Sequence, residues 1–94
     1  MKTKKKLSTE YLRLEGHRVT TFVIMAMDSA PEHRALMADI FEAYKSWLKR
    51  HELPATKLNL DGFGRLFPKD IWPRKAIRLN GTLGKGIVGA KPFA

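Results

Sequence analysis

The chain has 94 residues, no cysteine and a formal net charge of +9. A chain of this length forms one small hydrophobic core, which argues against a large catalytic cleft between domains. The lack of cysteine excludes a disulfide framework and a thiolate metal site, and the longest apolar run, "FVIMAM" at residues 22–27, is far shorter than the roughly 20 residues of a membrane span. We therefore expect a soluble, intracellular binding domain with no membrane partner.

Basic residues are concentrated at the two ends of the chain. Residues 45–94 contain eleven basic and three acidic side chains, whereas residues 7–44 contain three basic and six acidic ones. Such an excess attracts polyanions, among which nucleic acid is the commonest, although a basic solubilising surface is the alternative. At the N-terminus, "MKTKKKL" has almost nothing apolar to bury. We predict a flexible basic arm over residues 1–8 and a single domain over residues 9–94.

The first helix is predicted from about Val19 to Met27. Within that range, Val19, Phe22, Val23 and Met27 recur at the spacing of one helix face. No single period extends across Gly16 to the apolar residues before it. The letters "VTTFVI" are also typical of a strand, so the helical interpretation depends on the spacing.

The second helix has the clearest pattern, an apolar stripe at steps of three and four residues made of Leu36, Ile40, Phe41, Tyr44, Trp47 and Leu48. Its start is ambiguous. Ser29 and Glu32 could form a capping box that begins the helix near Ala30, or a start near Ala38 could leave a short extended segment before it. Because Tyr44 and Trp47 belong to the stripe, we assign them to the core, and base stacking on them is the less favoured alternative.

A short helix is predicted over residues 60–67. Asn59 can cap its N-terminus, Asp61 suits the first turn, and the buried face consists of Phe63, Leu66 and Phe67. The opposite side carries Gly62, Arg65 and the flanking Lys69. A small residue there allows close approach to another surface, and an arginine can reach phosphates or guanine edges.

A β-hairpin is predicted from about Lys75 to Ala90. Asn80-Gly81 is a strong turn signal, and alternating apolar residues flank it on both sides. The hairpin is cationic. Arg74 and Arg78 are expected on one face of the first strand, and Lys85 near the tip of the second.

Motifs for catalysis or metal binding are lacking in this sequence. The three histidines are scattered, no set of carboxylates and hydroxyls is recognisable as catalytic, and "GTLGKG" does not have the spacing of a Walker motif. We expect no enzymatic activity, no cofactor and no metal.

Two helices, a short helix with a basic side and a cationic hairpin follow the order of a winged helix. The segments "DIFEAYKSWLKRHELP", "LNLDGFGRLF" and "RKAIRLNGTLGKGIVGAK" resemble the winged-helix domain at the C-terminus of phage and plasmid primase-helicases of the poxvirus type. The family features are a "YxxW" pair, an "FGRxL"-like recognition helix and a basic wing around "NG". The resemblance covers roughly residues 19–91. It departs from the family in the return strand, where Ile87 and Val88 replace an aromatic residue.

The resemblance implies an α+β winged helix-turn-helix with three helices, a short first strand that includes "HRALM", and a C-terminal hairpin wing. It implies a phage or plasmid replication role, in the cytoplasm of a bacterial or virus-infected cell. We expect the helix over residues 60–67 to enter a major groove of double-stranded DNA while the wing clamps the backbone. The expected DNA-binding residues are Lys57, Asn59, Gly62, Arg65, Lys69, Arg74, Lys75, Arg78 and Lys85.

Two alternatives stay open at this stage. The domain could bind RNA or single-stranded nucleic acid, or it could be a protein-interaction module that docks a replication helicase or primase. A helicase or primase is also an expected partner of the DNA-binding form, and a homodimer could read paired half-sites.

The basic arm gives a first prediction. Deleting residues 1–7 removes four lysines and should weaken DNA binding and flatten its dependence on salt, because fewer counterions are released. The melting temperature should not change, since an arm that packs on nothing does not stabilise the fold. Mobility-shift titrations at two salt concentrations measure the slope, and an unchanged slope would show that the arm does not contact phosphates.

Overall fold

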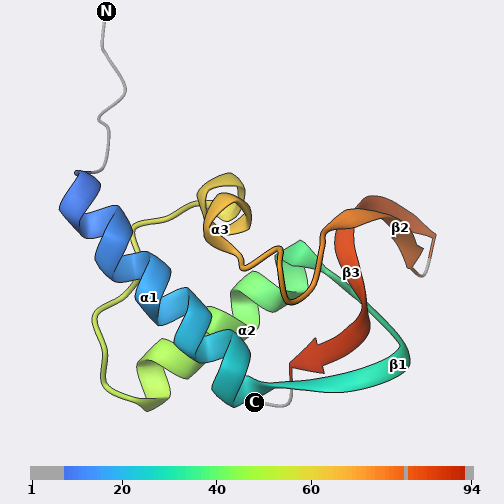
Figure 1. The fold of residues 1–94 in the computed structure, drawn as a ribbon, viewed down its shortest axis with the longest axis horizontal. Coiled ribbons are helices and arrows are strands. Elements are labelled where there is room, and N and C mark those ends of the chain that lie inside the picture. Colours follow the sequence, from blue (N-terminus) through green and yellow to red (C-terminus); the bar gives the residue numbers. More distant parts are fainter. Residues whose placement is uncertain (1–7, 80, 93–94) are drawn as a thin grey trace, which may run out of the picture.

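The computed structural model describes residues 8–79 and 81–92, so the predicted arm over residues 1–7 lies outside the described part. Within these ranges the element order is α1 (Thr9–Ala26), β1 (Met27–Leu36), α2 (Met37–Arg50), α3 (Leu60–Leu66), β2 (Lys75–Leu79) and β3 (Thr82–Pro92). The strands form an antiparallel sheet in the order β1-β3-β2. Figure 1 shows the helices gathered on one side and the sheet on the other. The predicted α+β class is confirmed.

Helix α1 is much longer than predicted. It begins at Thr9 rather than near Val19, and the side chain of Ser8, which we had assigned to the arm, caps it by accepting a hydrogen bond from the Tyr11 backbone N–H at 3.0 Å. Gly16 therefore lies inside the helix. A Cβ atom at Gly16 would lie 3.9 Å from the Leu66 side chain of α3, an ordinary van der Waals distance. Helix α1 therefore passes close to α3 at this residue. No described helix has both the length and the apolar character needed to cross a membrane.

Strand β1 resolves the ambiguous start of α2 in favour of the later alternative. The capping box does not form, because Ser29 and Glu32 both lie in β1, and α2 begins at Met37. The first strand is not short, since it runs over 10 residues. Its pairing with β3 is interrupted between Ser29 and Arg34 and resumes with Arg34 opposite Val88. This pairing holds β1, which connects α1 to α2, against β3.

The pairing of the predicted hairpin is confirmed, while Asn80 of the predicted turn lies outside the described residues. Leu79 lies opposite Thr82, and Gly81 has a φ of 82°, which glycine adopts without strain. Strand β3 extends to Pro92, beyond the predicted end at Ala90. In the return strand, Ile87 is fully buried and Val88 is 38% exposed. The aliphatic Ile87 thus supplies the core contact of the return strand.

The core is built from aromatic rings on three helices. The apolar stripe of α2 is buried from Ile40 to Leu48, as predicted. The Trp47 ring lies edge-on to the Phe22 ring of α1, with 5.7 Å between ring centroids, and the Tyr44 ring stacks on the Phe63 ring of α3 at 5.3 Å. Edge and offset arrangements of this kind suit the charge distribution of aromatic rings. The assignment of Tyr44 and Trp47 to the core is confirmed.

One carboxylate is buried in this core. Glu15 of α1 is fully buried, and the Tyr44 hydroxyl donates a hydrogen bond to its Oε2 atom. Its Oε1 atom has no hydrogen-bond partner among the described residues and lies 4.0 Å from the Arg18 guanidinium. Burial, and next the bond to Glu15, raise the pKa of the Tyr44 hydroxyl above its ordinary value of 10.0. The pair joins α1 to α2 through a polar contact that tolerates few changes.

The core predicts the effect of removing Trp47. Trp47→Ala should lower the free energy of unfolding by roughly 3–5 kcal/mol, because it leaves a cavity between α1 and α2. Trp72→Ala is the matched control, since Trp72 is only partly buried against the core, and it should cost less. Urea unfolding followed by circular dichroism measures both. A Trp47→Ala variant as stable as the control would show that the ring does not support the core.

The Tyr44 hydroxyl predicts an alkaline loss of stability. In the unfolded chain the phenol ionises near its ordinary pKa, whereas the folded protein holds the proton to higher pH. The contribution of the Tyr44 hydroxyl to the free energy of unfolding is therefore fully present below about pH 10 and is lost as the pH rises above it. Tyr44→Phe should cost about 1–3 kcal/mol at neutral pH, because Glu15 loses its donor, and should lose less further stability between about pH 9 and pH 11 than the wild type. Parallel stability curves for the two proteins would contradict this account.

Candidate nucleic-acid interface

Helix α3 is held in place from both its end and its buried face. The Asn59 side chain caps it, accepting a hydrogen bond from the Gly62 N–H at 2.8 Å. Phe63 is fully buried and Phe67 is 2% exposed. A helix of seven residues with two glycines is not stable in isolation, so the cap and these two rings determine where its outer side points.

The outer side of α3 presents one long cation. The Arg65 side chain is 76% exposed, and its Nη2 atom forms an ion pair at 2.9 Å with the Asp61 carboxylate one turn earlier. A Cβ at Gly62 would come within 3.3 Å of Asn59 and Leu58 of its own segment, so glycine leaves room for the α3 cap there. The exposed position of Arg65 is confirmed, and the DNA-binding role given to Gly62 stays a prediction.

The glycine that leaves room for a neighbouring side chain is Gly64. It is buried, and a Cβ at this position would come within 2.8 Å of the Nη1 atom of Arg74. Arg74 directly precedes β2, and its half-buried side chain lies across this gap in α3. Its Nε atom is shielded from solvent and has no hydrogen-bond partner among the described residues. Arg74 is therefore a partly buried cation that lies between α3 and the hairpin.

A groove of about 550 Å³ runs between α3, the start of α2 and the β2–β3 hairpin. Its walls are mainly apolar, with Arg74 and Lys85 as cations and Asp61 as the one carboxylate. The complete lining is Leu36, Met37, Ala38, Leu60, Asp61, Gly64, Arg74, Thr82, Gly84 and Lys85. The apolar residues of this groove belong to elements that meet only in the folded chain, so the sequence did not indicate a groove there.

Lys85 lies at the base of the hairpin and not near its tip. It pairs with Ala76, whereas the turn follows Leu79. Lys85 thereby lines the main groove together with Arg74, and the same two residues line a second hollow of about 240 Å³ that also includes Lys69 and Lys75. The two hollows together form a continuous cationic border along the hairpin base.

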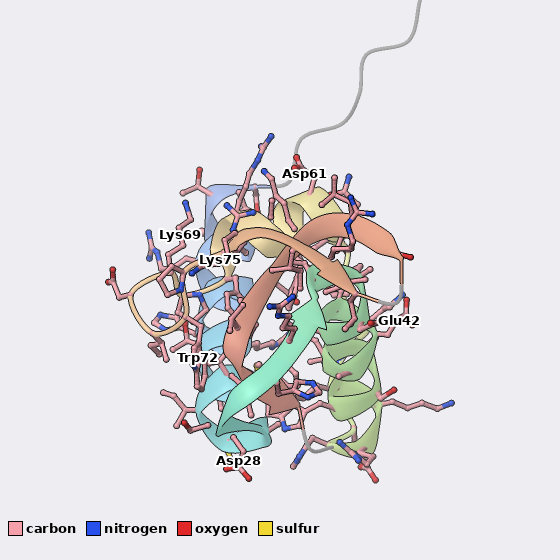
Figure 2. The ribbon with its side chains drawn as sticks, turned by 90° about the vertical axis from the view of Figure 1, so that its right-hand side faces the viewer. Asp28, Glu42, Asp61, Lys69, Trp72 and Lys75 are labelled. Atoms are coloured by element: carbon pink, nitrogen blue, oxygen red, sulfur yellow. The ribbon has the colours of Figure 1, made fainter. Side chains whose placement is uncertain are left out.

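Most of these cations have no acidic partner. The ion pairs among the described residues involve Arg18, Lys45 and Arg65, so the cations of the hairpin base take part in none of them. Arg78 is exposed on β2, on the strand face opposite the buried Ile77. Figure 2 shows Lys69 and Lys75 on the α3 side of the molecule and Asp28 at the far end. An unpaired cationic side attracts a polyanion at long range.

Two predicted site residues are already engaged elsewhere. Lys57 places its ammonium 5.4 Å from the centre of the Tyr11 ring, and its backbone N–H donates to the Tyr11 hydroxyl at 2.7 Å. Asn59 uses its side-chain oxygen as the α3 cap. Neither lines the grooves, so their first effect is to position α3 and the segment before it.

The described residues include no group of three or more histidine, aspartate or glutamate side chains that could hold a metal ion. Comparisons of the chain with protein-family models, with curated proteins and with solved structures found no match. The functional argument therefore depends on the geometry and charge of this interface.

Proposed function

We propose that this protein is a winged-helix domain that binds double-stranded DNA, with α3 as the recognition helix and the β2–β3 hairpin as the wing. The observation that carries the proposal is the group of cations on α3 and the hairpin base, most of them without an acidic partner. The element order and the strand order β1-β3-β2 support it, because a winged helix has the same order. We further propose a role in phage or plasmid replication, as the sequence resemblance implies.

Arg65 is the candidate reader of bases. Its partner Asp61 is 73% exposed, and such exposed pairs contribute roughly 0.3–0.5 kcal/mol. Exchanging Asp61 for a guanine edge or a phosphate therefore costs little.

The wing residues have a different role. Arg78 projects from β2 away from the core, and Lys75 lies at the strand's start, where it lines the smaller hollow. Contacts of such residues with phosphates set the register of the protein on DNA and carry no sequence information. The proposal thus assigns reading to the helix and clamping to the hairpin.

A second candidate function is docking of a replication protein. It is favoured by the apolar lining of the main groove and by Leu60 and Leu83, which are 42% and 66% exposed. This candidate predicts that binding to a helicase or primase persists after Arg65→Glu and Arg78→Glu. The DNA-binding proposal predicts that these two reversals abolish binding to duplex DNA.

The division between reader and clamp gives a direct test. Arg65→Ala should barely change the melting temperature, since the side chain is exposed. It should cost about 1–3 kcal/mol on a selected duplex and much less on random duplex. Arg78→Ala should weaken both nearly equally, because phosphate contacts ignore sequence. Fluorescence titrations with both duplexes measure the four affinities.

Two outcomes would count against this division. Equal losses for the two variants on both duplexes would reduce α3 to a backbone contact. No loss for either variant would contradict docking through α3 and the wing, and it would favour the protein-interaction candidate. Titrations with single-stranded DNA and RNA belong in the same experiment, because tighter binding to either would replace duplex DNA as the ligand.

A further inference from the structure

We propose that Arg74 forms a fixed anion site in the main groove, which holds a single phosphodiester of the bound nucleic acid and is kept in position by Gly64. This inference deepens the proposed function and rests on it. It differs from the general picture of a basic wing, in which each cation is mobile and contributes mainly charge. Here one guanidinium has a defined place before the ligand arrives.

The first support is the contact with α3. A Cβ at residue 64 would come within 2.8 Å of the Nη1 atom of Arg74, a separation that real Cβ contacts do not show. Only glycine at this position leaves room for the guanidinium where it lies. Arg74 therefore lies against the helix with its Nε atom shielded from solvent, and a side chain that is already partly buried loses less conformational entropy when it binds an anion.

The second support is the unused donor. The Nε atom of Arg74 is shielded from solvent, and no described residue accepts its hydrogen bond. None of the ion pairs among the described residues includes Arg74. A buried donor without an acceptor is costly. A small shift of the side chain that lets a phosphate oxygen accept from Nε removes this cost, and the guanidinium fork matches two phosphate oxygens.

The third support is the composition of the groove. Lys85 adds a second cation beside Arg74, while Leu60 and Leu36 supply apolar surface. Asp61 also lines the groove, but its carboxylate is paired with Arg65. A charged ligand with apolar parts, such as a phosphodiester flanked by sugar carbons, fits this lining. Because the apolar walls displace water, the attraction between Arg74 and an anion is screened less than on an open surface.

The glycine allows a test in which the charge of the protein does not change. Gly64→Ala should displace the guanidinium while leaving every cation present. Gly64 is buried but also lines the groove, so the double variant with Arg74→Ala is needed to separate an effect through Arg74 from an effect of the methyl group itself. Gly16→Ala is the matched control, since it is also a helical glycine but would place its Cβ at an ordinary distance of 3.9 Å from Leu66.

Affinities for a random duplex would be measured for the wild type, Gly64→Ala, Arg74→Ala, the double variant and the Gly16→Ala control. We expect Gly64→Ala and Arg74→Ala each to weaken binding by about tenfold, the double variant to lose no more than Arg74→Ala, and the control to bind like the wild type. Wild-type affinity in Gly64→Ala, or losses that multiply in the double variant, would overturn the proposal.

If Gly64→Ala does not fold, Arg74→Lys replaces it. The lysine keeps the charge without the fork, so wild-type affinity in that variant would also overturn the proposal.

A separate measurement distinguishes failure of the site from failure of the proposed function. Inorganic phosphate is titrated into ¹⁵N-labelled wild-type protein while the Arg74 Nε–H signal is followed by NMR. A saturable shift that is absent in Gly64→Ala supports the anion site, even if the wild type binds no duplex DNA and the proposed function is wrong. No shift with phosphate or with duplex DNA overturns the site, and a shift with free phosphate alone assigns it to a small anion instead of a nucleic acid.

Discussion

Phe63 lies between the rings of Phe41 and Tyr44, at centroid distances of 5.0 Å and 5.3 Å, and this packing holds the short helix α3 on α2. Seven residues with two glycines do not form a stable helix alone, so the direction of Arg65 and the place of Gly64 both follow from the burial of one ring. The Asn59 cap fixes the start of the helix. The position of α3 thus depends on the aromatic core beneath it, although the cations of the interface are mostly exposed.

Local patterns predicted the elements whose stability is local. The stripe of α2, the Asn59 cap and the Asn80-Gly81 turn each depend on residues within a few positions of one another, and sequence spacing captures such contacts. The length of α1 was missed although its Ser8 cap is a local signal, because no single apolar period crosses Gly16 and the first half also depends on a distant contact, the hydrogen bond between Glu15 and Tyr44. Strand β1 was underestimated for the same reason, since its partner β3 comes at the end of the chain.

The candidate site shows the same division between local and distant contacts. Sequence identified the cations, because charge is visible without a fold, and it identified the exposed position of Arg65 from the helical spacing. It could not show that Lys85 pairs with Ala76 at the hairpin base, or that Arg74 lies across Gly64. The interface therefore combines several exposed cations, which attract a polyanion at long range, with one guanidinium, that of Arg74. This guanidinium occupies space that a side chain at residue 64 would fill.

The central claim is that α3 and the hairpin base meet duplex DNA. The most direct measurement is an NMR titration of the ¹⁵N-labelled wild-type chain with a random-sequence duplex, in which backbone amide signals report contact residue by residue. The account predicts that the shifts concentrate in residues 60–66 and 74–86, while the outer side of α1, where Ile24 and Met25 are exposed, stays unchanged. Shifts centred on α1, or no shifts at a concentration that saturates other basic DNA-binding domains, would contradict it.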